Sequence, residues 1–200
     1  MDHGQKYAVF KLTGFIFSLV LLITSQSWAR QSLSGTIKTL GSIVFIQTSE
    51  LSKPIELVPK TTEIKNVLNR LDINDPIICS GSQLEEGKFQ VESIDFVGLR
   101  KLLGSWINTS SQGFIRFDNF LEVTMDMGIF SAKSLNRLTR YQTVKYTISP
   151  ADQGWVIFVS NNMQTLIGTI DLNDKSASLK FYDGISGDLI ADMNLIKLYE

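Results

Sequence analysis

Short stretches in which apolar and polar residues alternate recur through the second half of the chain. In Thr143–Ile148 and Ala177–Tyr182, every second residue is apolar. Successive side chains of a strand point to opposite faces, so each stretch would have one buried and one solvated face. This pattern predicts the wall of an antiparallel β-barrel or sandwich. The residues expected to point inward are Val144, Tyr146, Ile148, Ala177, Leu179 and Phe181.

Further stretches rich in β-branched and aromatic residues predict strands along most of the chain. Glycine, proline, asparagine and aspartate separate several of them and predict turns. The predicted strands of the first half are Ser34–Leu40, Ser42–Thr48, Pro54–Pro59, Ile77–Gln83 and Lys88–Val97. Those of the second half are Phe114–Phe117, Leu121–Met125, Thr143–Ile148, Trp155–Val159, Thr165–Leu172, Ala177–Tyr182 and Leu189–Tyr199.

Thr61–Leu71 has the period of a helix. Its apolar residues Ile64, Val67, Leu68 and Leu71 stand at i, i+3, i+4 and i+7, which places them in one stripe. Thr61 or Thr62 can cap the start, and Glu63 suits the first turn. The sequence therefore predicts one amphipathic helix between the third and fourth strands.

The fifth predicted strand contains a change of parity. Phe89 and Val91 share one face, whereas Ile94 and Phe96 fall on the other. One inserted residue reverses the alternation of a strand, so we expect a β-bulge near Glu92-Ser93.

Three strands, a helix and two strands, in that order, resemble the five-stranded OB barrel. The resemblance covers residues 32–97 and implies an OB-like domain over residues 30–98. A short apolar connector follows at residues 99–103, and its composition favours two halves that pack on each other.

Residues 104–200 open on Gly104-x-Trp106 and continue as a run of predicted strands, which resembles a small calycin or lipocalin-type barrel. In that family the tryptophan closes one end of the barrel, and Trp106 is the matching residue. This half is much shorter than a typical lipocalin. The arginine that often stacks on the tryptophan has no clear counterpart, and Lys197 is the nearest candidate. A β-sandwich or a second open barrel remains an alternative.

The first 29 residues have the features of a signal peptide. Lys6 and Lys11 precede the apolar core Leu12–Ile23, and Ser27-Trp28-Ala29 resembles a small-x-small cleavage site. The core is shorter than the roughly 20 residues that span a bilayer. We expect an exported chain that starts near Arg30, with periplasmic or secreted localisation; an uncleaved N-terminal anchor is the alternative.

The histidine and cysteine content excludes several kinds of chemistry. His3 is the only histidine and lies in the segment expected to be removed, and Cys79 is the only cysteine. Serine–histidine catalysis and histidine-ligated zinc are therefore excluded from the mature chain, as is an intramolecular disulfide. Cys79 lies in an apolar strand and is expected to be a buried small hydrophobe. No metal site and no cofactor are predicted.

Two sets of residues are candidates for binding. If the second barrel is hollow, four large aromatic residues would line an apolar ligand site, and if it is filled they are core: Trp106, Trp155, Phe158 and Phe181. In Ser131–Tyr141, the basic residues Lys133, Arg137 and Arg140 would share one helical face. That face would suit an acidic partner, although an ordinary solvated loop is the simpler explanation.

The formal net charge of −1 gives no field to concentrate nucleic acid, so no nucleic-acid partner is expected. The sequence predicts a mostly β, exported, non-enzymatic binding or interaction module of the cell envelope. The alternative is a carrier of a small lipophilic ligand in the second barrel. A carboxylate-based hydrolase is the remaining enzymatic possibility, because few other catalytic groups are left.

Overall fold

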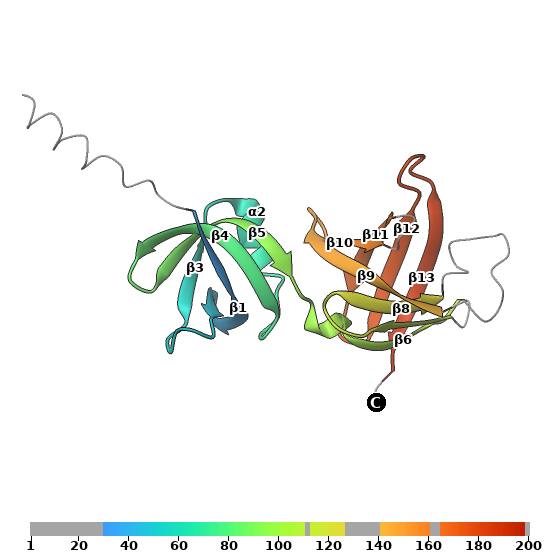
Figure 1. Cartoon of the computed structure of the whole chain (residues 1–200), viewed down its shortest axis with the longest axis horizontal. Helices are drawn as coiled ribbons and strands as arrows, with labels where there is room; N and C mark the ends of the chain where they lie inside the picture. Colours follow the sequence, from blue (N-terminus) through green and yellow to red (C-terminus); the bar gives the residue numbers. More distant parts are fainter. Residues whose placement is uncertain (1–29, 111–112, 127–140, 161–164, 199–200) are drawn as a thin grey trace, which may run out of the picture.

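Two β-barrels lie side by side in the computed structural model, joined by one short connector (Figure 1). The structure describes residues 30–110, 113–126, 141–160 and 165–198. The prediction of a mostly β chain with one helix is confirmed. In these described ranges no helix has the length and apolar content needed to cross a membrane. The expected signal peptide and the basic residues Lys133, Arg137 and Arg140 lie outside the described residues.

The first barrel has the predicted order of three strands, a helix and two strands. Its sheet order is β1-β2-β3-β5-β4, and pairing of β4 with β1 closes it. The β3–β5 pair is parallel and the other pairs are antiparallel. The elements are β1 (Gln31–Leu40), β2 (Ile43–Gln47), β3 (Ile55–Pro59), α2 (Thr62–Leu68), β4 (Pro76–Glu85) and β5 (Lys88–Val97).

Helix α2 begins where predicted and buries apolar residues of the predicted stripe, but it ends about one turn earlier than predicted. The Thr61 hydroxyl accepts a hydrogen bond from the Ile64 N–H at 3.3 Å, and Val67 and Leu68 are buried. After Leu68 the chain tightens into i→i+3 bonds, the last from the Leu71 N–H to the Leu68 carbonyl. Leu71 is still buried, so the tighter turn keeps the apolar stripe intact.

Strand β5 contains two bulges where one was predicted. Glu92 is skipped in the pairing with β4, which confirms the bulge expected near Glu92-Ser93. Asp95 is skipped as well, and this second insertion reverses the alternation again. As a result Val97 is buried with 2% exposure, and Phe96 is only partly buried. The expectation that Phe96 shares the inner face of Ile94 was wrong for this reason.

The second barrel is a closed antiparallel meander of eight strands. Each strand pairs with its neighbours in sequence, and β13 pairs with β6 to close the ring. The 3₁₀ helix η1 (Arg100–Leu102) leads into it. The strands are β6 (Gly104–Asn108), β7 (Phe114–Phe117), β8 (Glu122–Asp126), β9 (Tyr141–Pro150), β10 (Trp155–Ser160), β11 (Thr165–Leu172), β12 (Ser176–Tyr182) and β13 (Leu189–Lys197).

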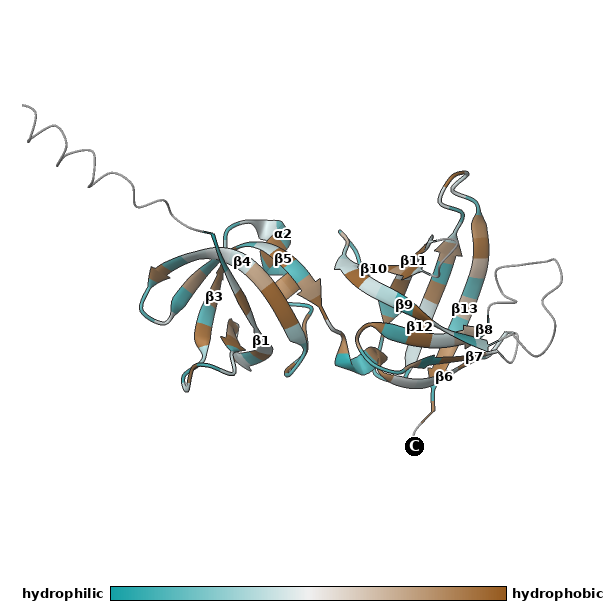
Figure 2. Cartoon of the chain, viewed as in Figure 1, coloured by the Kyte–Doolittle hydropathy of each residue, from teal (hydrophilic) through white to brown (hydrophobic). Residues whose placement is uncertain are grey.

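The alternation that predicted this wall holds in the structure. Apolar and polar residues alternate along β9 and β12 of the second barrel (Figure 2). The inner faces form a continuous apolar core that includes every residue expected to point inward: Val144, Tyr146, Ile148, Ala177, Leu179 and Phe181. The prediction of a half-buried barrel wall is confirmed.

One end of the second barrel abuts the first barrel, and we call it the junction end. Residues 118–121, 151–154 and 173–175 connect strands at this end. Arg70 of the first barrel bonds the turn at 151–154, and Lys101 of the connector pairs with Asp174. Phe120 lies beside Gly98, where β5 gives way to the connector.

Candidate functional site

Three of the four aromatic residues predicted to line a ligand site lie on the inner face of the second barrel. Trp106 and Phe181 have no exposed surface, and Trp155 is 6% exposed. Both tryptophans stand near the junction end, Trp106 two residues after the start of β6 and Trp155 at the start of β10. The structure therefore places both indoles at the base of the barrel.

Phe158 was predicted for the same inner set, and this was wrong. Ile157 and Val159 are buried with 0% and 2% exposure, so Phe158 between them points to the outer face, where it is partly buried. Trp155 is buried on the same side as Ile157. The sequence of β10, WVIFVS, is apolar on both faces and gives no alternation from which to choose the inner set.

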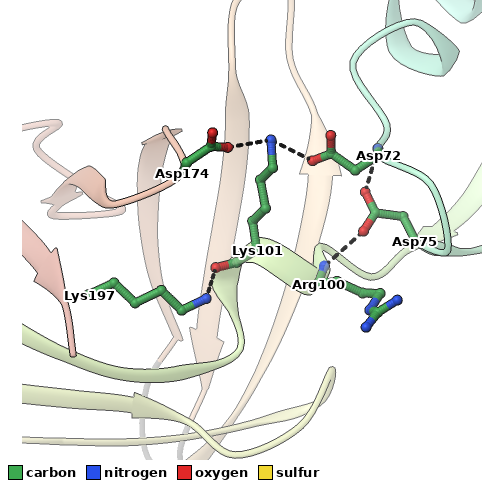
Figure 3. Close-up of polar contacts among 6 residues, drawn as sticks. All are labelled: Asp72, Asp75, Arg100, Lys101, Asp174 and Lys197. Carbon is green, nitrogen blue, oxygen red and sulfur yellow. Dashed lines mark hydrogen bonds and ion pairs between the residues drawn. The ribbon is translucent and has the colours of Figure 1, made fainter. Parts of the chain in front are cut away.

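Trp106 is held at the base by two polar contacts (Figure 3 shows the lysines). Its indole N–H donates to the Leu102 carbonyl of η1 at 2.7 Å. The Lys197 ammonium lies 5.3 Å from the centroid of the indole ring and donates to the Lys101 carbonyl at 2.7 Å. Partial burial lowers the pKa of Lys197 from its ordinary value. Trp106 thus ties η1 to the barrel.

A second cation covers the second tryptophan, and it comes from the other barrel. The Arg70 guanidinium lies 5.0 Å from the centroid of the Trp155 ring. Its two terminal nitrogens donate to the carbonyls of Gly154 at 2.7 Å and Ala151 at 2.8 Å. Its Nε is buried and has no hydrogen-bond partner. Arg70 thus contacts the second barrel through two hydrogen bonds and one cation–π contact.

The connector adds an ion-pair bridge between the barrels (Figure 3). The Lys101 ammonium lies 2.8 Å from a carboxylate oxygen of Asp174 in the second barrel and 3.0 Å from one of Asp72 in the first. The hydrogen bonds that the ammonium donates to Asp174, and secondly to Asp72, raise the pKa of Lys101. All three side chains are at least 41% exposed, so salt screens this bridge.

Asp75 fixes the connector from the first barrel. Its carboxylate accepts hydrogen bonds from the Asp72 N–H at 2.8 Å and from the Arg100 N–H at 2.9 Å (Figure 3). The side chain is almost fully buried, and burial raises the pKa of Asp75 although these bonds oppose the shift. The carboxylate therefore links the backbone at Asp72 to the backbone at Arg100, at the start of η1.

Two of the cavities in the part of the chain that the structure describes border the first barrel. One, of about 380 Å³, lies at the junction between α2 and the β9–β10 turn, and Arg70, Glu63 and Asp152 line it. The other, of about 160 Å³, lies between β2, β3 and α2. We call the second one the β2–β3 groove; it is lined by Ser42, Ile43, Val44, Glu56, Leu57, Val58, Pro59, Lys65, Leu68 and Asn69.

Metal-ligating and nucleophilic side chains are further candidates for a site in the part of the chain that the structure describes. No set of three or more histidine, cysteine, aspartate or glutamate side chains is placed to hold a metal there. Asp72 and Asp174 converge, but on the Lys101 ammonium, whose hydrogen bond lowers the pKa of Asp174. Cys79 is fully buried as expected, and burial raises the pKa of its thiol to about 12.

Sequence reasoning missed Arg70 and Lys101 as contact residues. Arg70 stands near the end of the predicted helix, and Lys101 stands in the apolar connector. Their partners lie far away in the sequence, 84 residues for the Arg70–Gly154 bond. Only the relative placement of the barrels brings these groups together, so no local pattern could have shown them.

Comparisons with known proteins give no match: no protein family, no curated protein and no solved structure resembles the chain significantly.

Proposed function

We propose that the chain is an exported, non-enzymatic binding module of the cell envelope that acts through contact with another protein. The apolar surface on the outside of the second barrel is the observation that carries this proposal. The proposed export follows from the apolar N-terminal stretch that precedes residue 30.

The apolar surface is a row of side chains that crosses four neighbouring strands. Phe158 pairs with Ile167, Ile167 with Tyr182, and Tyr182 with Leu189. All four lie on the outer face, and Ile167 and Leu189 are 38% and 53% exposed. We call these four residues the outer row. Ile185, in the adjoining β12–β13 turn, is fully exposed.

Scattered apolar residues are common on protein surfaces, but a contiguous patch is typical of an interaction site. Polar groups border the outer row on both sides. The Lys180 ammonium and the Asp192 carboxylate lie 3.6 Å apart on one side, and the hydroxyls of Ser160 and Thr165 are hydrogen-bonded on the other. An apolar centre with a polar border is the usual composition of a protein–protein interface.

The finer fold assignments belong to the same proposal. The β1-β2-β3-β5-β4 order with a parallel β3–β5 pair supports an OB-like first domain. The Lys197 ammonium over the Trp106 ring, with η1 before it, supports a lipocalin-like second domain in which lysine takes the place of arginine. Neither assignment specifies a ligand.

Native mass spectrometry of the protein purified from its own host tests the proposal. We expect a second polypeptide to be associated with the wild-type protein and to be lost in the double variant Ile167→Thr, Leu189→Thr. Ile73→Thr is the matched control, because Ile73 is 55% exposed on the first barrel. A wild-type protein without a partner, or a partner that the double variant retains, would contradict the proposal.

Transport of a small lipophile in the second barrel is the second candidate. Its support is an apolar inner face that Trp106 closes at the junction end. Organic extraction of the protein purified from its host would release a stoichiometric lipophile if this function is correct. A protein that yields no lipophile would eliminate the carrier function and leave the interaction function standing.

A further inference from the structure

The pairing between β2 and β3 stops early and leaves two strand edges facing a groove. Only two residue pairs join these strands, Phe45 with Glu56 and Ile46 with Ile55. Farther along, Ile43-Val44 and Leu57–Pro59 belong to the strands but have no partners across the gap. Pro59 has no N–H, so it cannot donate the hydrogen bond that would extend the ladder here.

The β2–β3 groove occupies this gap. Its volume of about 160 Å³ is large enough for one apolar side chain, and helix α2 closes its base with the buried Leu68. Val44, Leu57 and Val58 form apolar walls. A gap in a β-ladder with an apolar pocket inside it combines backbone hydrogen-bonding groups with a place for a side chain.

The surroundings of the groove continue its apolar character and add one charge. Ile43 is 42% exposed at the mouth, and its pairing partner Leu40 is 72% exposed. Lys65 lines the groove with an exposed side chain, and its ammonium has no ion-pair partner within 4.0 Å in the described structure. Glu56 also lines the groove, and its carboxylate interacts electrostatically with the Lys88 ammonium.

We propose that the β2–β3 groove binds an extended segment of a partner protein. The segment lies along β2, where Val44 directs its N–H and C=O away from β1 and toward the gap, whereas β3 lacks a donor at Pro59. One apolar side chain of the segment enters the groove above Leu68, and an acidic side chain next to it pairs with Lys65. This is strand addition with side-chain selection, and it deepens the proposed interaction function, on which it rests.

Selection of random linear peptides from a display library against the purified full chain tests this site. We expect selected peptides to alternate apolar positions and to carry an acidic residue beside one of them. Methylation of the peptide's own backbone N–H groups that face β2 removes hydrogen-bond donors and should weaken peptide binding about tenfold. Methylation of the peptide's alternate N–H groups, which face away from β2, should not weaken it.

Substitutions in the protein give the second readout. Ile43→Asp should weaken peptide binding about tenfold, because it places a charge at an apolar mouth. Lys65→Glu should weaken peptide binding about threefold, because an exposed ion pair contributes free energy on this scale. Lys53→Glu is the control, since Lys53 carries the same charge on the exposed surface of the first barrel and does not line the groove. Circular dichroism confirms that each variant is folded.

Failure to select any peptide, or binding that neither backbone methylation nor these substitutions affect, would overturn the proposed groove site. Native mass spectrometry separates this failure from that of the wider proposal. A partner that remains with Ile43→Asp but is lost with Ile167→Thr, Leu189→Thr rejects the groove and keeps the interaction function. A wild-type chain that is purified without a partner rejects both.

Discussion

The Arg70 guanidinium on the first barrel lies 5.0 Å from the centroid of the Trp155 ring on the second. Its bonds to the Gly154 and Ala151 carbonyls hold the guanidinium in place. Hydrogen bonds from a charged donor contribute about 1.5–3 kcal/mol, and a cation over an indole about 0.5–2 kcal/mol. The unpartnered Nε opposes this with a desolvation cost of about 1–3 kcal/mol. Arg70 therefore favours one relative orientation of the two barrels.

Arg70→Ala should lower the free energy of unfolding by about 1–3 kcal/mol, because it leaves two turn carbonyls without their donors. Differential scanning calorimetry should show one cooperative transition for the wild type and two for the variant, since the barrels are then less strongly coupled. Arg116→Ala is the control; Arg116 pairs with Asp118 on the surface, and its loss should cost about 0.5 kcal/mol or less. Equal effects of the two substitutions would contradict the prediction.

Gly168→Ala should destabilise the second barrel. A methyl group at Gly168 would lie 2.5 Å from the Lys180 carbonyl oxygen of the neighbouring strand, so the backbone would have to shift. Overpacking of this kind costs about 1–3 kcal/mol, which urea denaturation can measure. Gly184→Ala is the matched control, because the nearest atom to its added methyl would be 3.9 Å away. An unchanged urea midpoint for Gly168→Ala would contradict the prediction, because it would show that strand β12 can shift without loss of stability.

Cys79 should make the protein less stable at high pH. Burial raises the pKa of its thiol from 9.0 to about 12, so the folded state keeps the proton that the unfolded state loses. The stabilisation is complete below pH 9 and is lost as the pH rises toward 12, by at most about 1.4 kcal/mol per pH unit. Urea titrations at increasing pH should show this loss for the wild type.

Cys79→Ala provides the control for that titration. The substitution lowers stability at neutral pH by leaving a small cavity, but it should flatten the slope above pH 9. A thiol reagent gives an independent readout, since the native wild-type thiol should react far more slowly than the thiol in urea. Identical slopes for the two proteins would show that other groups cause the pH dependence.

Trp106→Phe should destabilise the protein by about 1–3 kcal/mol. The substitution removes the indole N–H that the Leu102 carbonyl accepts and leaves that carbonyl without its donor at the base of the barrel. Phe117→Leu is a comparison within the same barrel, because Phe117 is also buried but contributes no hydrogen bond. Hydrogen exchange should show faster exchange in residues 99–103 for Trp106→Phe only.

The sequence predicted the fold well wherever one face of a strand was polar. Ala177, Leu179 and Phe181 alternate with polar residues, and each is buried as expected. Phe158 was misplaced because β10 is apolar on both faces, and its outer side belongs to the outer row. The Asp95 bulge was missed because Val97 ends the strand, so no further residue revealed the second change of parity.

The candidate sites were harder to predict than the fold. The β2–β3 groove depends on where a ladder stops, and the proline that limits it was interpreted only as a strand boundary. Arg70 and Trp155 are 85 positions apart, and a contact at that distance depends on tertiary packing alone. Lys197 was recognised as a candidate because the Gly104-x-Trp106 resemblance pointed to a cation in the last strand, and the structure places it over the indole.

The contacts of η1 determine at which residue the second barrel can be separated from the rest of the chain. Leu102 is fully buried and provides the acceptor for Trp106, and the Lys101 carbonyl binds Lys197. A recombinant fragment that began at Gly104 would lack both acceptors and would expose the apolar base of the barrel to solvent. A fragment that began at Leu99 would keep both acceptors, and η1 would cover the apolar base of the barrel. The 3₁₀ helix η1 is therefore better described as the first element of the second barrel than as a linker between two barrels.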